Sequence, residues 1–592
     1  MKQFFFIIFL FSFGFGFSQN EQLADNYFKR GEFEKALISY QKLYEKNKGN
    51  YKYIYKLIET HQQLEQYDEA QILLLERISK SNNPSLLVEL GYNYQLKGNL
   101  EISDTYYTDA IIAIDENPAY AYGVAKRFQD HSLLEKAIIA YKKGMALNPK
   151  QNFYVQLAHI YGELGNIEQL FSNYINYIES KPSFLNNGKR AFSDFISENS
   201  GNENNVTLRK LLLKKIQTQP DEIWYDMLSW LYIQEKAYNK AFIQEKALYK
   251  RNPESLTRIT DLALTAINEK DYDTANSIFN YILENSQDIE TRLKAHQYLL
   301  DIETTTANKK DLKAIQEKYL ALFKQYGRYE QTISLQIAYG DFLAFNLHQP
   351  EEASAFLKKS LKLELSLFQE ATVKLKLGDI LVFQEKFNEA LIYYSQIQAN
   401  LKNSIISQQA RYKVAKTSYY KGDFEWAESQ LKILKASTSQ LIANDALDLK
   451  LLISDNIQED SLHTALRLYS KADLFAFQNK NDEAIALLGK ILTEHKGETI
   501  EDQALFMQAK LFESTKQYDK AVANYEYIIA NYRDEILADD AYFYLAQLYQ
   551  TQLGEPEKAK PLYENILFNH EDSIYFIEAR KRFRMLRGDA IN

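Results

Sequence analysis

The chain lacks the residue constellations with which most enzymes do chemistry. Its eight histidines are scattered and no two stand four residues apart, so no helix can present a two-histidine metal site. It has no cysteine, which excludes disulfides, thiol catalysis and cysteine-bound metals. It also has no glycine-rich phosphate loop, no Gly-x-Ser-x-Gly elbow and no His-Glu-x-x-His helix. We therefore expect no enzymatic activity, no cofactor and no metal.

The composition of the chain is better suited to binding a partner than to catalysis, because it is rich in aromatic residues. The 592 residues include 44 Tyr and 34 Phe, and aromatic rings offer a large contact area at low entropic cost. Hydrophobic residues make up 46% and charged residues 25%, which is typical of a globular protein. The net charge of −9 and a pI near 5.7 argue against nucleic acid as a partner, because nucleic-acid binders usually carry a basic stripe.

Helices must position these side chains. With only 20 Gly and 9 Pro, the chain cannot supply the frequent turns that sheets and barrels need. A short unit recurs instead, as in Gly31-x-Phe33-x-x-Ala36-x-x-x-Tyr40, and twelve to thirteen residues before it stands a second pattern such as Leu87-x-x-Leu90-Gly91-x-x-Tyr94. Both patterns have helical spacing, so each repeat predicts a pair of helices joined by a tight turn.

This pattern resembles the tetratricopeptide repeat, whose 34-residue period and small residues match it. The resemblance implies an all-α superhelix, a solenoid of stacked antiparallel helix pairs. Small residues at the helix crossing keep the two axes close, and aromatics such as Tyr94 and Tyr107 are expected to fill the space toward the next pair. The small residue of the second helix gives the repeat register: Ala36, Ala70, Ser103, Ala137, Leu170, Ala241, Ala275, Ala353, Ala390, Ala427, Ala484, Ala521 and Ala559.

The register divides the chain into two expected arrays, with a boundary near residues 301–310. Residues 19–300 form the first array, which includes an irregular helical segment at about 183–219. Residues 311–592 form the second, with an extra helix at about 440–454 and a basic capping helix at 572–587. Asn205-Val206-Thr207 is a formal glycosylation sequon, which we interpret as loop chemistry in the irregular segment.

Residues 1–18 read as a signal peptide. An apolar run from Phe4 to Phe17 is too short to span a membrane, and the small residues Gly16 and Ser18 precede a cleavage point before Gln19. No later stretch is apolar enough to be a transmembrane span. Since lipoprotein anchoring needs a cysteine, no lipid anchor is expected. An uncleaved membrane anchor at residues 1–18 is the alternative.

The end of the chain has a further resemblance. Residues 461–588, with repeats about 37 residues apart, are similar to periplasmic repeat proteins, namely the repeat lipoprotein of the outer-membrane β-barrel assembly machine and the coordinator of the Tol–Pal system. Those assembly lipoproteins carry an acylated cysteine, which this chain lacks. The resemblance implies an exported protein that is periplasmic or associated with the outer membrane, and secretion is also open.

The repeat family also implies a binding surface, because the first helices of its pairs line a groove. Mapped onto this sequence, the partner-binding candidates are Tyr55, Glu59, Tyr92, Gln95, Tyr122, Lys126, His159, Trp230, Tyr412, Lys416, Tyr419 and Tyr420. Packing against a neighbouring helix is the alternative role for each of them. Trp230 has two specific readings: an aromatic anchor for a partner, or a core residue under the irregular segment.

Together these features predict a non-enzymatic interaction scaffold of the cell envelope that binds a peptide or helix of a partner protein in its groove. The alternative is a glycan or peptidoglycan binder that uses the groove aromatics as stacking platforms. An aromatic pair with nearby amides would favour sugar, whereas scattered Tyr with Lys and Glu favours peptide. The identity of the partner and the oligomeric state are left open.

Overall fold

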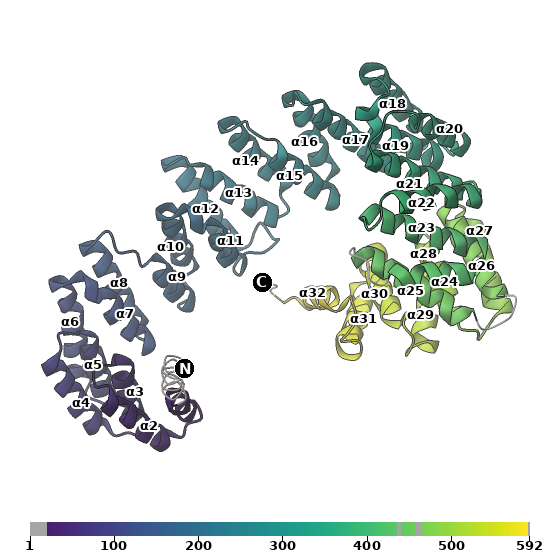
Figure 1. The fold of residues 1–592 in the computed structure, drawn as a ribbon. Coiled ribbons are helices and arrows are strands. Elements are labelled where there is room, and N and C mark those ends of the chain that lie inside the picture. Colours follow the sequence, from purple (N-terminus) through teal and green to yellow (C-terminus); the bar gives the residue numbers. More distant parts are fainter. Residues whose placement is uncertain (1–19, 435–439, 458–462, 590–592) are drawn as a thin grey trace, which may run out of the picture. The chain divides into compact units, whose positions relative to one another are not determined.

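The computed structural model describes residues 20–434, 440–457 and 463–589, and every regular element in them is helical (Figure 1). The expected all-α class is therefore confirmed, while the predicted signal peptide at residues 1–18 lies outside the described residues. Among the described residues, no helix combines the length and the apolar character that a membrane span requires.

The packing divides the chain into two compact units, Met1–Leu231 and Tyr232–Asn592, and the division falls inside helix α13. The boundary expected near residues 301–310 is not where the packing divides. Helix α17 (Ile289–Thr306) runs into that polar segment and packs on α16 and α19. Only the residues that follow it, up to the start of α18 at Leu312, lie between helices.

Unit 1 opens with a helical stretch at residues 20–29, and its later elements follow in chain order. They are α2 (Phe33–Lys46), α3 (Tyr51–Gln63), α4 (Tyr67–Lys80), α5 (Ser85–Leu96), α6 (Leu100–Glu116), η1 (Pro118–Tyr120), α7 (Ala121–Asp130), α8 (Leu134–Leu147), α9 (Tyr154–Glu163), α10 (Ile167–Ser180), η2 (Pro182–Phe184), α11 (Leu185–Ser193), α12 (Glu203–Thr218) and the start of α13 (Glu222–Gln234).

Unit 2 continues the alternation of helices, with two short π-helical turns, η4 and η5. Its elements are α14 (Tyr238–Arg251), α15 (Thr257–Asn268), α16 (Tyr272–Asn285), α17, α18 (Leu312–Tyr326), η3 (Glu330–Thr332), α19 (Ile333–Asp341), η4 (Phe342–Asn346), α20 (Pro350–Ser360), α21 (Leu367–Phe383), α22 (Phe387–Asn400), α23 (Ile405–Lys421), α24 (Phe424–Leu434), α25 (Gln440–Asn456), α26 (Thr464–Phe477), α27 (Asn481–Glu494), α28 (Glu501–Ser514), α29 (Tyr518–Asn531), α30 (Ala538–Leu548), η5 (Tyr549–Leu553), α31 (Pro556–Asn569) and α32 (Phe576–Arg587).

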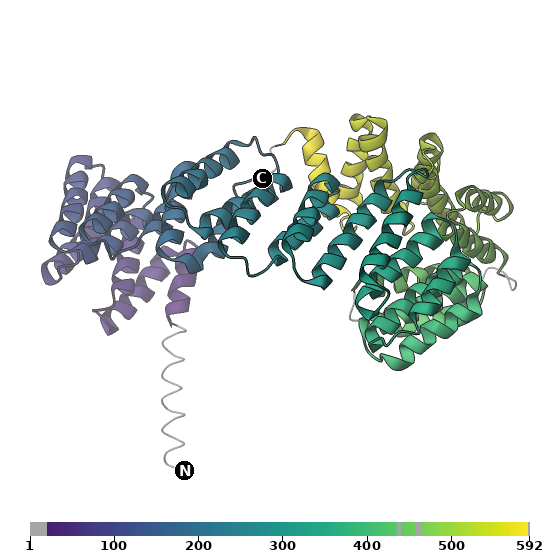
Figure 2. The same cartoon turned by 90° about the horizontal axis from the view of Figure 1, so that it is seen from above.

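Within each unit, successive helices lie side by side and run in opposite directions, as Figures 1 and 2 show from two sides. Helices pair as α5 with α6, α7 with α8, and α28 with α29, and each pair packs on the next. This is the stacked helix-pair plan that the repeat predicted. One pair has too little core to be stable alone, so stacking on its neighbours provides most of the stabilisation.

The small residues that define the repeat register are buried without exception. Each of the thirteen positions exposes at most 2% of its surface, from Ala36 to Ala559. Gly91 shows why a small residue is needed in the first helix of a pair. A methyl group there would lie 2.6 Å from the ring of Tyr107 and 3.0 Å from the backbone oxygen of Ser103. The close approach therefore involves the aromatic side chain four residues after the register position, as well as the register position itself.

The aromatics take the expected places between neighbouring pairs. Tyr107 contacts Gly91 of its own pair and the ring of Phe128 in the next, at 5.4 Å. Tyr94 stacks on Tyr106 at 5.5 Å and accepts a hydrogen bond from Gln71 of the preceding pair. Much of the tyrosine content is therefore structural.

The irregular segment contains helices α11 and α12, joined by a loop that Asn205 holds in place. The Asn205 side chain is fully buried; its Oδ1 accepts from Ser197 N and its Nδ2 donates to Ser197 O. The sequon itself lies at the start of α12 and not in the loop, but its buried amide holds that loop in place.

The basic helix at the end of the chain has the features of a cap. Helix α32 begins at Phe576, four residues later than expected, and packs on α31. When Ala579 is aligned with Ala541 of α30, Lys581 and Arg584 take the places of Phe543 and Ala546, which are buried in α30. Charged residues at positions that are otherwise interior suit a terminal repeat, whose outer face meets solvent.

An extra helix changes the packing in the middle of unit 2. Helix α25 packs on α24 and α23, and α26 then returns to α23. Just after α26, Gln478 Nε2 donates to Phe383 O at 2.9 Å, and Lys471 pairs with Glu385 at 2.8 Å. The Phe477 ring lies 6.3 Å from that of Phe383. We refer to these contacts between α26 and the α21–α22 turn as the α21–α26 interlock.

Candidate functional site

A groove of about 940 Å³ crosses the first helices of three successive pairs in unit 1. Helices α3, α5 and α7 and the turn after α3 contribute its walls, and we name it the α3–α5–α7 groove. Its lining residues are Tyr51, Lys52, Tyr55, Lys56, Glu59, Gln62, Gln63, Glu65, Tyr67, Glu89, Tyr92, Leu96, Arg127, Asp130 and His131.

The helical period of α3 explains which of its side chains reach the groove. Ile54, Leu57 and Ile58 are buried in the core. Since residues four apart lie on one face of a helix, Tyr55 and Glu59 share the face that borders the groove, and Tyr55 also packs against the edge of the core. The helix begins at Tyr51, where the side chain of Asn50 accepts a hydrogen bond from Lys52 N.

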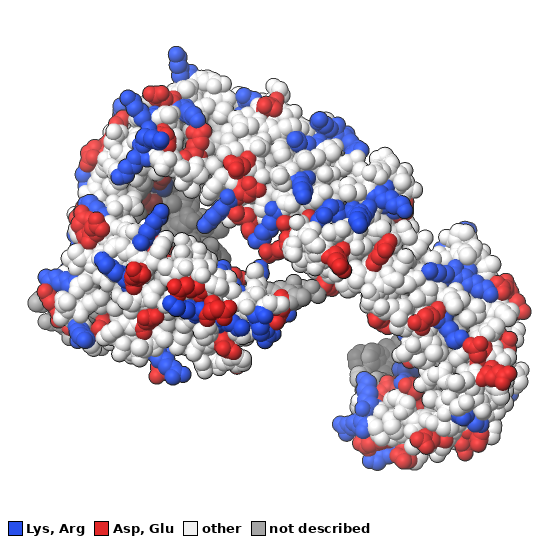
Figure 3. All heavy atoms as spheres, turned by 180° about the vertical axis from the view of Figure 1, so that it is seen from behind, with Lys and Arg blue, Asp and Glu red and all other residues white. Residues whose placement is uncertain are grey.

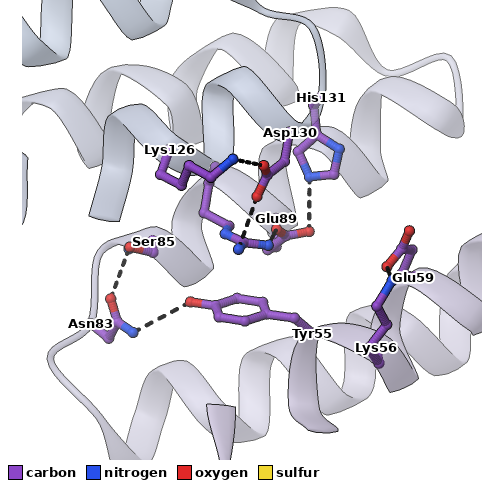
Figure 4. A network of polar contacts seen from close by, with 10 residues as sticks. Tyr55, Lys56, Glu59, Asn83, Ser85, Glu89, Lys126, Asp130 and His131 are labelled. Carbon is purple, nitrogen blue, oxygen red and sulfur yellow. Dashed lines mark hydrogen bonds and ion pairs between the residues drawn. The ribbon is translucent and has the colours of Figure 1, made fainter. Parts of the chain in front are cut away.

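Arg127 of α7 contacts three residues of the groove, among them Glu89 and Asp130, which Figure 4 labels. Its Nη2 lies 2.9 Å from Asp130 Oδ2 and its Nη1 lies 3.5 Å from Glu89 Oε1. Its guanidinium also lies over the ring of Tyr55, 4.2 Å from the centroid. This arginine thus joins α7 to α5 through the carboxylate of Glu89 and to α3 through the ring of Tyr55, while Asp130 holds it from its own helix.

Glu89 is a buried carboxylate with two partners. Only 3% of the residue is exposed, and in addition to Arg127 it contacts His131, whose Nε2 lies 3.0 Å from Glu89 Oε2. The imidazole of His131 stacks on Tyr92 with a centroid distance of 3.8 Å. A buried carboxylate is costly unless it is paired, so Glu89 depends on these two neighbours.

Two tyrosines of the groove, Tyr55 and Tyr92, have raised pKa values and keep their hydroxyl protons over the physiological pH range. Burial and the nearby charge of Glu89 raise the pKa of Tyr55 to about 12. The same two causes, burial first, raise the pKa of Tyr92 above its ordinary value. Tyr55 Oη accepts a hydrogen bond from Asn83 Nδ2 at 3.4 Å. The rings therefore act as neutral contact surfaces and hydrogen-bonding groups.

Three of the predicted binding residues line this groove: Tyr55, Glu59 and Tyr92. Lys126 lies beside it and pairs with Asp130 at 2.6 Å, as Figure 4 shows. Gln95 has a different role, because its Oε1 accepts a hydrogen bond from Tyr107 Oη at 2.8 Å.

The other predicted residues of unit 1 lie away from the groove. Tyr122 is half exposed, 6.2 Å from the ring of Phe153, and the exposed ring of His159 meets Tyr174 edge-on at 6.1 Å. Trp230 lies in α13 and is partly buried, so both readings of its role stay open. Trp224 of the same helix, in contrast, is 2% exposed and belongs to the core.

The four candidates in unit 2 form a packed cluster on α23. Lys416 pairs with Asp473 of α26 and lies over the rings of Tyr419 and Tyr420, at 5.0 and 5.2 Å. Burial lowers the pKa of Lys416, but the charge of Asp473 outweighs it and keeps the pKa above its ordinary value.

Tyr419 must be corrected as a groove residue. Its side chain is fully buried in the core of unit 2, so a partner cannot reach it. Tyr412 and Tyr420 are partly buried beside it, and burial raises the pKa of both. Packing between α23 and α26 is the main role of this cluster.

Reading the sequence alone missed Glu89, Arg127, Asp130 and His131. A signal for Glu89 was available: it stands between Val88 and Leu90 in an otherwise apolar part of α5, where a carboxylate must be paired. Two cavities of unit 2 were also missed. One of about 660 Å³ lies along α15 to α17, and one of about 650 Å³ lies between α17 and α19.

The side chains of the described residues determine whether the chain can hold a metal ion and what kind of ligand its groove can bind. Within residues 20–434, 440–457 and 463–589, no group of three His, Asp or Glu side chains is placed to hold a metal ion. On the face shown in Figure 3, basic and acidic side chains are interspersed over both units. The groove combines ring faces, carboxylates and amides, which are groups suited to holding a polypeptide.

Comparison with known proteins gives one informative match. The tetratricopeptide repeat model matches residues 503–534 and 540–573, which contain the pairs α28–α29 and α30–α31. No curated protein sequence matches the chain. Similar solved structures include the APC/C hetero-tetramer Cut9–Hcn1 (12% identity, 96% of each chain covered, TM-score 0.24). Another is Naa15/Naa10 bound to HypK-THB (12% identity, 96% of this chain and 92% of that chain covered, TM-score 0.29).

Both TM-scores are too low to support an argument about the fold. The sequence match is consistent with the register derived above, since Ala521 and Ala559 both fall within the matched residues. Residues 503–534 and 540–573 thus carry tetratricopeptide repeats, which suggest a protein–protein interaction scaffold.

Proposed function

We propose that the chain is a non-enzymatic scaffold of the cell envelope that binds an extended peptide or a helix of a partner protein in the α3–α5–α7 groove. The groove itself is the observation that carries this proposal. It crosses three successive helix pairs, so its length suits a polypeptide segment better than a small molecule.

The occupation of the ring faces favours a polypeptide over a sugar. One face of Tyr55 is covered by the guanidinium of Arg127, and one face of Tyr92 is covered by His131. A sugar ring stacks on an open aromatic face. The charged and amide groups around these rings, in contrast, match the backbone and side chains of a peptide.

Photo-crosslinking from inside the groove tests this proposal. A photoreactive phenylalanine analogue replaces Gln63, which lines the groove and is exposed, and in a matched control it replaces Glu34, an exposed residue of α2 outside the groove. After irradiation of cells, we expect partner adducts from position 63 and none from position 34. Adducts of equal yield from both positions, or adducts from position 34 alone, would contradict groove binding.

Export is the second part of the proposal. Its support is the apolar run from Phe4 to Phe17 and the small residues that precede Gln19, together with the likeness of residues 461–588 to periplasmic repeat proteins. Amino-terminal sequencing of the protein from the envelope fraction should return Gln19 as the first residue. Recovery of Met1 from that fraction would contradict cleavage, and recovery of the protein only from the cytoplasm would contradict export.

A further inference from the structure

We propose that the α3–α5–α7 groove selects basic partner segments, so that a Lys or Arg side chain of the partner enters it. This inference rests on the proposed groove binding and adds the chemistry of the partner. Its basis is an asymmetry between the charges of the groove: each of its lysine and arginine side chains is paired with a carboxylate of the protein, while one exposed lining carboxylate, Glu65, forms no ion pair among the described residues.

Each lining cation has an acidic partner. Lys52 pairs with Glu21, a residue of the first helical stretch. Lys56 lies 2.7 Å from Glu59 Oε2 and over the ring of Phe28, 4.5 Å from its centroid. An anionic ligand would therefore have to displace an internal carboxylate to reach either lysine.

Arg127, the third cation, is held even more firmly. It contacts two carboxylates and the ring of Tyr55, and its side chain is only 26% exposed. It also compensates the buried charge of Glu89. Drawing Arg127 toward an anionic ligand would weaken that compensation, and a carboxylate left buried with fewer partners is strongly destabilising.

The carboxylates are in excess. Glu59, Glu65, Glu89 and Asp130 line the groove against three cations. In the part of the chain that the structure describes, Glu65 forms no ion pair, and it is exposed. The side chain of Glu59 is 41% exposed despite its pairing with Lys56. Glu65 is therefore the acceptor that a ligand cation can reach without opening an existing ion pair, and Glu59 is a second acceptor that a ligand cation can reach by replacing Lys56.

Arg127 shows how the groove holds a cation. Its guanidinium is placed between an aromatic face and carboxylates, the geometry that combines cation–π attraction with charge-assisted hydrogen bonds. Tyr67 and Tyr92 line the groove together with Glu59 and Glu65. These aromatic rings and carboxylates can hold a cation of the partner in the way that Tyr55, Glu89 and Asp130 hold Arg127.

The test compares two fluorescent peptides of equal length, one with a Leu-Lys-Ala-Arg repeat and one with a Leu-Glu-Ala-Asp repeat, titrated with the purified protein. Fluorescence anisotropy should show binding of the basic peptide, weakening as salt is added, and weaker or no binding of the acidic one. Glu65→Gln should weaken binding of the basic peptide about two- to fivefold, the range of exposed ion pairs, and adding Glu59→Gln should weaken it further.

Glu34→Gln is the matched control, since it removes an exposed carboxylate outside the groove and should leave the affinity unchanged. Equal or tighter binding of the acidic peptide, or unchanged binding by the Glu59→Gln/Glu65→Gln variant, would overturn the inference about charge. Groove binding itself would survive that result if position 63 still gives crosslinks.

If neither peptide binds, the segment crosslinked to position 63 decides the question. A segment that contains Lys or Arg at the crosslinked site supports the inference, and one without them overturns it. Absence of crosslinks from position 63 together with absence of peptide binding would instead contradict the proposed function on which the inference rests.

Discussion

The repeat register makes opposite predictions for two glycines of unit 2 when each is replaced by alanine. Gly378 lies in α21 and Gly489 in α27, both inside helices. Alanine is favoured over glycine in a helix interior by about 1 kcal/mol, so both variants should be stabilised if backbone conformation alone decided the outcome. The packing around the two positions differs.

A methyl group at position 378 would lie 2.4 and 2.5 Å from the ring atoms Cε1 and Cζ of Tyr394, far inside van der Waals contact. That ring cannot move easily, because Tyr394 is 1% exposed and its hydroxyl donates to Asp379 at 2.7 Å. Overpacking of a core costs about 1–3 kcal/mol. Loss of a hydrogen bond to a charged group adds about 1.5–3 kcal/mol if the ring is displaced.

We therefore expect Gly378→Ala to destabilise α21 and α22 by up to about 2 kcal/mol from overpacking after the helix-propensity gain of about 1 kcal/mol is subtracted, and by about 1.5–5 kcal/mol if Tyr394 also loses its hydrogen bond. A methyl group at position 489 would meet only Gln508 Nε2 at 3.6 Å, an ordinary contact. Gly489→Ala should thus stabilise its region by up to about 1 kcal/mol.

Hydrogen exchange measured by mass spectrometry suits this comparison, because a long repeat array need not unfold in one step. Amides of α21 and α22 should exchange faster in Gly378→Ala, and those of α27 should exchange more slowly in Gly489→Ala. Stabilisation of the α21–α22 region in Gly378→Ala would refute the close approach of Tyr394 to α21, and with it the packing role of the repeat glycine.

Three further substitutions test buried polar groups. Burial raises the pKa of Asp502 to about 6, so the folded state loses stability as the pH rises from about 4 to 6. Asp502→Asn should remove that decline and gain roughly 2–3 kcal/mol at pH 7.5, measured by urea unfolding across pH. Glu245 is 4% exposed and pairs at 2.8 Å with Arg258, whose side chain is 56% exposed, so Glu245→Ala removes a charge-assisted contact and should cost about 1.5–3 kcal/mol and lower the midpoint of urea unfolding; an unchanged midpoint contradicts this. Asn205→Ala should speed proteolysis near Ser197 through loss of two hydrogen bonds, and an unchanged digest would contradict its role.

Much of the fold could be predicted from the sequence because each repeat carries its own local signal. Eleven of the thirteen register positions are alanine, because a small residue lets two helices cross closely; the exceptions are Ser103 and Leu170. All thirteen register positions are buried. The same local logic identified α25 and α32 within a few residues of their observed ends.

The site was less predictable from the sequence. Mapping the repeat family onto the chain indicates which face of a helix a side chain occupies, but it does not indicate which other residues that side chain contacts. Tyr419 is fully buried beside Tyr420 and Phe424, in a part of unit 2 where α23 packs on α24, α26 and the extra helix α25, and no repeat template contains that helix. Glu245 reads as a surface residue one turn after Ala241, yet Arg258 from the next helix covers it. Arg127 and Glu89 are 38 positions apart, and only the folded chain shows that they compensate each other.

The α21–α26 interlock has a consequence for the way unit 2 comes apart. In an ordinary repeat array each helix pair contacts only its neighbours. Local unfolding can therefore spread from one pair to the next along the array. The contacts from Gln478 and Lys471 to the α21–α22 turn connect segments more than eighty residues apart. Unfolding of any helix between α21 and α26 therefore requires that the contacts of the α21–α26 interlock break as well. Helices α22 to α26 should therefore exchange and unfold as one cooperative block, while the terminal pair α31–α32 opens on its own.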